Sequence, residues 1–193
     1  MGLELTKPFL MLNTENRQIL RDLAYQSIKH GLMTGKALEI DIAQYPHELQ
    51  KKKATFVTLH RNKELRGCIG ILKPIRPLAE DIAYNAWAAA FSDSRFMPLA
   101  ENELDDLDIH ISILGTPEEI EFESEQDLVK QIRPGVDGLI LEEGFNKGTF
   151  LPSVWESLTD AQEFLDHLKI KAGLPANYWS DTLKVKRYTV EEF

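Results

Sequence analysis

The sequence contains very little cysteine: one residue, Cys68, in a chain of 193. A single thiol excludes an internal disulfide and a zinc site built from several thiolates. We therefore expect a reducing compartment and place the protein in the cytoplasm. Long hydrophobic runs are also missing, because no window approaches the roughly 18 apolar residues that a membrane-spanning helix needs. Residues 1–8 are too acidic and too interrupted to form a secretory signal, so no membrane association is expected.

Positive charge is in short supply as well. Basic residues are outnumbered by acidic ones, 22 to 31, and the formal net charge is −9. Nucleic-acid binding depends on neutralising phosphates, so bulk binding of DNA or RNA is unlikely on charge grounds. No glycine-rich loop ends in Lys-Ser or Lys-Thr, and a nucleotide site of that kind is not supported. The five histidines show no metal-ligand spacing, so no metal site is predicted, and the sequence leaves any cofactor unknown.

Ordinary globular patterning fills the rest of the chain, with 43% hydrophobic and 27% charged residues. Helical spacing of apolar residues predicts helices over 13–31, 77–90, 124–132 and 161–172. Alternation predicts strands over 54–60, 65–72, 107–113, 139–141, 149–151 and 183–190. Hairpins with helices between them indicate an α+β fold, in which helices pack on an antiparallel or mixed β-sheet. We expect one domain over 1–193, divisible into two subdomains, with about 54–150 holding most of the sheet.

One hexapeptide, Leu65-Arg66-Gly67-Cys68-Ile69-Gly70, differs in kind from its surroundings. Glycine weakens the interior of a strand, so Gly67 and Gly70 imply that another backbone or a ligand comes close. Arg66 and Cys68 are two residues apart, which puts them on one face of an extended strand. A nearby guanidinium favours the reactive thiolate, so Cys68 is a candidate nucleophile and Arg66 a candidate anion-binding group. The competing interpretation is a buried Cys68 that packs as a small apolar residue, with Arg66 paired to a carboxylate.

His60 is a third catalytic candidate, as a general base, and its role depends on the hairpin register. A two- or four-residue loop pairs His60 with Leu65 and Val57 with Cys68, which separates His60 from the thiol. A three- or five-residue loop brings His60 to the face of Arg66 and Cys68. Alternation favours the four-residue loop, and both registers stay open.

Two further stretches carry polar groups. Residues 91–99 mix polar and aromatic side chains, as loops that form sites often do, although a plain connection is the alternative. From this loop we take Asp93 and Arg95, with Gly67 and Gly70, as candidate substrate-binding residues. Asp108, His110 and Ser112 alternate along a strand, but side chains about 6.6 Å apart are too distant for the ~3 Å contacts of a catalytic triad. A solvated strand face is the better interpretation.

The chain resembles the AMMECR domain family, known in bacteria and archaea as AmmeMemoRadiSam system protein A. The resemblance rests first on the complete hexapeptide and extends, in order, through the stretches 93–99, 111–114, 135–139, 150–154 and 171–174. Ser94 departs from the family, which commonly has proline there. The resemblance implies a two-lobed α+β fold with an antiparallel sheet, and a signature segment beside a cleft between the lobes.

The resemblance implies less about function, because the activity of similar proteins is not established. The family name records an association with a Memo-like protein and a radical-SAM protein, which are therefore the expected partners. Two hypotheses follow. The first is an enzyme or enzyme component that binds a small anionic or carbonyl substrate in a cleft lined by Arg66 and Cys68. The second is a non-catalytic binding module for a protein partner, in which the hexapeptide serves packing.

Overall fold

A computed structural model describes residues 11–193 of the chain. The expectations about residues 1–8 lie outside this range. Two compact units divide the chain: the first runs to Leu114 and includes Glu191–Phe193, and the second is Gly115–Val190. The expected subdomain range, about 54–150, crosses this division. Helices and two antiparallel sheets confirm the α+β class. No helix within 11–193 is long and apolar enough to cross a membrane.

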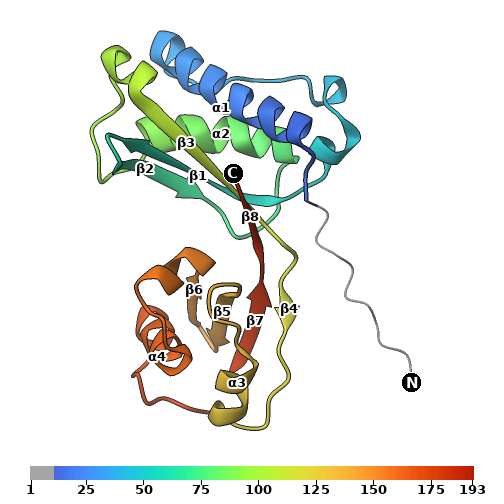
Figure 1. The fold of residues 1–193 in the computed structure, drawn as a ribbon, viewed down its shortest axis with the longest axis vertical. Helices are drawn as coiled ribbons and strands as arrows, with labels where there is room; N and C mark the ends of the chain where they lie inside the picture. Colours follow the sequence, from blue (N-terminus) through green and yellow to red (C-terminus); the bar gives the residue numbers. More distant parts are fainter. Residues whose placement is uncertain (1–10) are drawn as a thin grey trace. The chain divides into compact units, whose positions relative to one another are not determined.

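The first unit is a four-stranded sheet with two helices on one of its faces (Figure 1). Its strand order is β2-β1-β3-β8. Two short 3-10 turns lie between α1 and β1, and a third precedes β3. The elements are α1 (Thr14–Thr34), β1 (Ala54–Arg61), β2 (Glu64–Gly70), α2 (Leu78–Phe91), β3 (Leu107–Leu114) and β8 (Val190–Glu192).

Helix α1 begins at an asparagine cap and ends later than its sequence suggests. The side chain of Asn13 accepts a hydrogen bond from the backbone of Asn16, as N-cap residues do. The helix passes through Gly31 and ends at Gly35, which has a φ of 73°. Gly31 instead permits close packing, because a Cβ there would lie 2.5 Å from Cε2 of Phe91. The glycine therefore marks the contact between α1 and α2.

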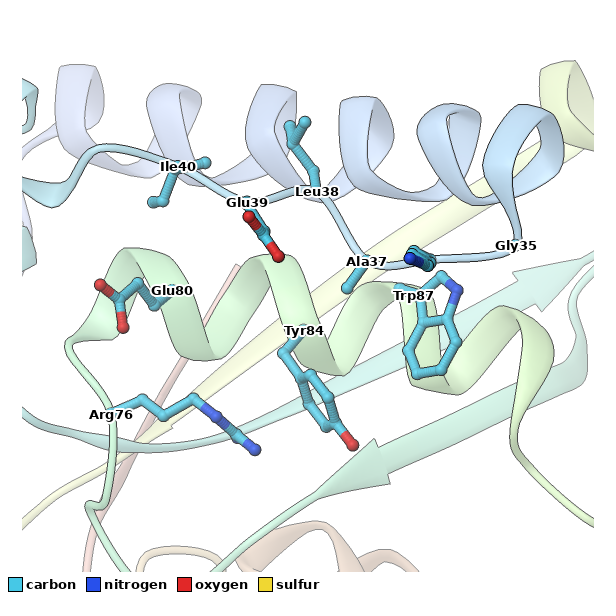
Figure 2. A pocket seen from close by; sticks show the side chains of 10 residues that line it. Gly35, Ala37, Leu38, Glu39, Ile40, Arg76, Glu80, Tyr84 and Trp87 are labelled. Atoms are coloured by element: carbon cyan, nitrogen blue, oxygen red, sulfur yellow. The ribbon is translucent and has the colours of Figure 1, made fainter.

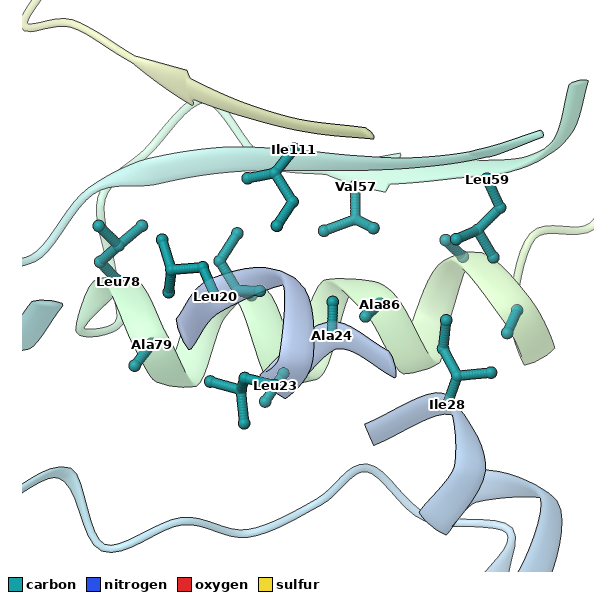
Figure 3. Close-up of a cluster of buried hydrophobic side chains, with 14 of the residues drawn as sticks. Leu20, Leu23, Ala24, Ile28, Val57, Leu59, Leu78, Ala79, Ala86 and Ile111 are labelled. Carbon is teal, nitrogen blue, oxygen red and sulfur yellow. The ribbon is translucent and has the colours of Figure 1, made fainter. Parts of the chain in front are cut away.

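The core of this unit lies between the helices and the inward face of the sheet, as Figure 3 shows. Val57 and Leu59 of β1 and Ile111 of β3 are fully buried there. Alternation along a strand sends the side chains between them to the opposite face. Helix α2 contributes mainly alanines to this core, which lets its backbone approach the sheet. One face of the sheet is thereby packed, and the other carries the polar residues considered below.

The second unit has its own four-stranded sheet and its own core. Its strand order is β4-β7-β5-β6, and Figure 1 shows α4 beside β6. The strand predicted over 183–190 corresponds to β7, except that Val190 begins β8, which belongs to the other sheet. The elements are β4 (Glu118–Glu119), α3 (Glu125–Gln131), β5 (Gly138–Glu143), β6 (Asn146–Phe150), α4 (Ala161–Lys171) and β7 (Lys184–Tyr188).

Candidate functional site

The hexapeptide lies on β2, and a tight turn followed by a bulge sets its register. Asn62 and Lys63 both have positive φ, 53° and 67°, as a two-residue hairpin turn of the primed type requires. His60 is opposite Leu65, as the favoured register predicts, but the register then shifts by one residue. Thr58, not Val57, is therefore opposite Cys68, so that part of the prediction is wrong. The bulge adds one residue to β2, and sequence alternation carries no mark of it.

The shift decides which side chains share a face. Residues directly opposite each other on antiparallel strands project from the same face of the sheet. Cys68 therefore shares its face with Thr58 and, two residues along β1, with His60. Neighbouring β3 adds three more side chains in register with these. We call this group the polar face: Thr58, His60, Cys68, Asp108, His110 and Ser112.

Both glycines of the hexapeptide accommodate other parts of the same chain. A Cβ on Gly67 would lie 2.1 Å from the carbonyl oxygen of Ala89 in α2. A Cβ on Gly70 would lie 2.3 Å from the carbonyl oxygen of Thr55 and as close to the ring of Phe56. The close approach inferred from the sequence is thus made by α2 and β1. The geometry gives these candidate substrate-binding glycines a packing role.

Arg66 is held by a carboxylate and a carbonyl. Its Nε and Nη2 donate to the two oxygens of Glu103 over 2.8 and 3.0 Å, and Nη2 also donates to the Met97 carbonyl over 2.9 Å. The hydrogen bond from Arg66 lowers the pKa of the Glu103 carboxyl to about 2. Because Arg66 lies in the bulge, its two-residue spacing from Cys68 does not bring the guanidinium to the thiol. Its charge is neutralised by Glu103, a residue with no local signal in the sequence.

Asp93 and Arg95 both form hydrogen bonds with the backbone of Cys68. The Cys68 amide donates to Oδ2 of Asp93 over 2.9 Å, and Nη2 of Arg95 donates to the Cys68 carbonyl over 3.4 Å. Arg95 also pairs with Asp93 at 2.7 Å, and this hydrogen bond holds the pKa of the Asp93 carboxyl well below its usual range. Both residues thus act on the signature strand itself. Neither charge is left free for a substrate.

The thiol of Cys68 is partly buried and meets a hydroxyl. Its Sγ lies 3.1 Å from Oγ1 of Thr58, within hydrogen-bond range. Thr58 is in turn directly opposite His110 on β3. The rings of His60 and His110 meet edge to face, with centroids 5.0 Å apart. One thiol, one hydroxyl and two imidazoles therefore stand on adjacent rows of the sheet.

Asp108 and His110 correct the argument made from strand spacing. Nε2 of His110 lies 2.9 Å from Oδ2 of Asp108, although the residues are two apart on one strand. Spacing along the backbone does not limit side chains that bend toward each other. Ser112 turns elsewhere and donates to Glu192 over 3.3 Å. An Asp-His pair is present, and the serine does not complete a triad.

A pocket lies elsewhere in the first unit. It has a volume of about 630 Å³ and is lined by α2 and by the segment after α1 (Figure 2). None of the hexapeptide residues lines it. The sequence signal for it is the spacing of Glu80, Tyr84 and Trp87 on one helix face. Within 11–193, no group of three or more His, Cys, Asp or Glu side chains is arranged to hold a metal ion.

Comparison with known proteins gives a consistent result along most of the chain. The family model AMMECR1 matches residues 21–193. Protein MJ0810 of Methanocaldococcus jannaschii is 39% identical over 172 residues, which cover 87% of this chain and 85% of that protein. Protein SSO0193 of Saccharolobus solfataricus is 40% identical over 185 residues, covering 92% and 80%.

A solved structure is similar as well. The uncharacterized protein PH0010 from Pyrococcus horikoshii has a TM-score of 0.84 and 38% sequence identity. The match covers 94% of this chain and 92% of that one. The arrangement of helices and sheets is therefore shared with an experimentally determined fold.

Proposed function

The chain belongs to the AMMECR1 family, and we propose that it is an enzyme or enzyme component that acts on a small carbonyl-bearing substrate at the polar face. The observation that carries the proposal is the contact of Cys68 Sγ with Thr58 Oγ1 on a face that also holds two imidazoles. Cys68 is the nucleophile, and His60 and His110 are the groups able to carry its proton. Asp108 orients His110 through their hydrogen bond.

Carbonyl substrates suit this arrangement better than anionic ones. The two arginines of the signature region already face carboxylates, Arg66 with Glu103 and Arg95 with Asp93. Their charges are thus balanced within the fold, which weakens the attraction for an anion. A carbonyl carbon needs only a nucleophile and a proton carrier, and both are present on the polar face. A link to a Memo-like protein and a radical-SAM protein is part of the proposal, and it rests on the family resemblance.

Two measurements test the catalytic role. Cys68 is the only thiol in the chain, so iodoacetamide adds mass at one place. We expect alkylation of the folded protein at neutral pH to be faster than that of N-acetylcysteine. We also expect a Cys68→Ala replacement in the cell to reproduce the loss caused by deleting the gene, with unchanged thermal stability. Slow alkylation together with full function of a stable Cys68→Ala protein would refute the proposal.

A second candidate function is a non-catalytic binding module for a protein partner. The observation in its favour is that five residues of the signature region, which the sequence presents as a substrate site, are all engaged within the chain. These are Arg66, Gly67, Gly70, Asp93 and Arg95. This alternative predicts an inert thiol, so the same alkylation measurement separates the two.

A further inference from the structure

The pocket beside α2 has the size and lining of a binding site. Glu80, Tyr84 and Trp87 line it from one face of the helix, since residues three and four apart are neighbours on a helix surface. Its volume of about 630 Å³ lies in the range of ligand sites, roughly 300–1,000 Å³. Figure 2 shows the Tyr84 ring between the Arg76 side chain and the Trp87 ring, below the segment 35–40.

A row of flat groups forms one wall. The guanidinium carbon of Arg76 lies 4.0 Å from the centre of the Tyr84 ring, and that ring lies 5.7 Å from the Trp87 ring. Arg76 also donates to Oδ1 of the fully buried Asp81 over 3.0 Å. Its charge is therefore neutralised from within the fold. Arg76 shapes the wall and leaves the electrostatic preference of the pocket to other groups.

Besides Arg76, the charged residues of the lining are Lys36, Glu39 and Glu80, so two carboxylates outnumber one ammonium group. Glu39 and Glu80 both line the pocket, and within residues 11–193 neither forms an ion pair. Figure 2 shows both near the end of the pocket that lies away from Trp87. Carboxylates beside aromatic faces attract a cationic group through charge and through the ring quadrupoles. The ligand should therefore carry a guanidinium or an ammonium group at this end.

The segment 37–40 offers its backbone to a ligand. The Leu38 amide donates to Oγ of Ser27 over 3.1 Å, and that hydroxyl donates to the Ala83 carbonyl over 2.7 Å. Ser27 thereby fixes the segment to α1 and α2. Within the described part of the chain, the other backbone groups of 37–40 have no hydrogen-bond partner. A fixed segment with free backbone groups is what an added extended peptide pairs with.

Trp87 adds an unsatisfied donor. Its Nε1 is buried and has no acceptor among residues 11–193. A buried donor without a partner costs about 1–3 kcal/mol, so a small shift of the Trp87 side chain that brings Nε1 to a ligand carbonyl is favoured. From Glu80 to Trp87 helix α2 advances about 10 Å, the length of about three extended residues. The pocket is thus long, and a row of carbonyls suits it better than a single small amine does.

We propose that this pocket binds an extended peptide of a partner protein that carries an arginine or lysine side chain. The basic side chain lies between Glu39 and Glu80, and the peptide backbone runs beside 37–40. The site uses none of the polar-face residues. It is therefore independent of the proposed catalytic function, and Cys68→Ala should leave it intact.

An array of acetylated, amidated pentapeptides tests the proposal. The central position is fixed as Arg, Lys, Ala or Glu, and the flanking positions are randomised. We expect the full-length chain to select basic centres, and the selected peptides to shift the Trp87 indole N–H resonance saturably. Glu39→Lys and Glu80→Lys should each weaken binding about tenfold or more. Glu101→Lys, an exposed glutamate outside the pocket, is the matched control and should bind as the wild type does.

Three results would overturn the proposal. One is an array without preference for a basic centre. Another is equal loss of binding in the Glu101→Lys control, because a general charge effect would then explain the result. The third is N-acetylarginine amide binding as tightly as the selected pentapeptides, which would replace the peptide by a small cation. Circular dichroism melting of each variant establishes that the proteins compared are folded.

Discussion

The backbone amide of Cys68 donates a hydrogen bond to Oδ2 of Asp93 over 2.9 Å. Because β2 is an outer strand of its sheet, the outward backbone groups of Cys68 have no strand partner. Asp93 accepts a hydrogen bond from the Cys68 amide, and Arg95 donates one to the Cys68 carbonyl. These two side chains thus form the hydrogen bonds that a neighbouring strand would otherwise form. Open sheet edges invite pairing with other chains, and this side-chain pair closes the edge at the thiol. The Asp-x-Arg spacing thus holds the signature strand in place.

Replacing Asp93 by alanine should destabilise the first unit. The change leaves the Cys68 amide without its acceptor and Arg95 without its partner. Hydrogen bonds to a charged group are worth about 1.5–3 kcal/mol, so we expect a loss of about 2 kcal/mol in the free energy of unfolding. Urea denaturation measures it. Ser94→Ala, an exposed change in the same loop, is the control and should stay within about 0.5 kcal/mol of wild type. Equal stability of the two variants would contradict the edge-closing role.

Gly67→Ala should be one of the most damaging small substitutions in the chain. The new methyl would lie 2.1 Å from a backbone carbonyl of α2, which cannot turn aside as a flexible side chain can. Overpacking typically costs about 1–3 kcal/mol, and we expect a loss at the top of this range or beyond it. Gly135→Ala is the matched control, because its φ is 76° and nothing lies within 4 Å of the new methyl. It should lose only the roughly 1–2 kcal/mol of backbone strain. A smaller loss for Gly67→Ala than for this control would count against the packing role.

Local pattern was enough to predict the α-helices, the α+β class and the strands of residues 11–193 except β4 and β8. The predicted helices, strands and hairpins follow from the spacing of apolar residues, because each element must bury its apolar face. Contacts between distant residues were not predictable in this way. Glu103 is 37 residues from Arg66, and no local signal connects the two. The sequence also extends the last predicted strand to residue 190, whereas β7 ends at Tyr188 and Val190 begins β8 in the other sheet.

The site was only partly predictable, and the bulge is the main reason. One extra residue between Leu65 and Gly67 moves Cys68 from opposite Val57 to opposite Thr58. A prediction from the alternation of side chains assumes a regular pleat, so it does not detect such an insertion. The interpretation of Arg66 as paired to a carboxylate, one of two considered, matches the contact with Glu103. Asp108 and His110 were judged too far apart because spacing was taken along the backbone, whereas their side chains meet.

The stability of the protein should depend on pH through Glu103. Its pKa in the folded protein is about 2, below the ordinary value for glutamate, mainly because Arg66 donates to it. A group with a lowered folded pKa stabilises the fold above its ordinary pKa, and this contribution is lost as the pH falls toward the folded value. We expect Glu103→Gln to be less stable than wild type at pH 7 and to approach it between about pH 4.5 and pH 2. Urea denaturation across this range measures the difference.

The exposed Glu101 provides the control for that experiment. Glu101→Gln removes a charge from the same short turn without touching Arg66, so its stability should follow that of wild type at every pH. A constant difference between Glu103→Gln and wild type from pH 7 to pH 2 would show that the ion pair contributes nothing through titration.

Thr58→Val should slow the chemistry of Cys68 while preserving the fold. The substitution keeps the branched shape and removes the hydroxyl that lies 3.1 Å from Sγ. A hydroxyl at this distance can share a hydrogen bond with the sulfur, so its loss removes the polar contact that orients the sulfur for reaction. Hydrogen bonds of this kind are worth about 0.5–1.5 kcal/mol, which corresponds to a fall of about twofold to tenfold in the alkylation rate with iodoacetamide. Ser112→Ala removes a hydroxyl from the same face, but one that donates to Glu192, and it should leave the rate unchanged. An equal rate for Thr58→Val and wild type would mean that the hydroxyl packs against the thiol without assisting it.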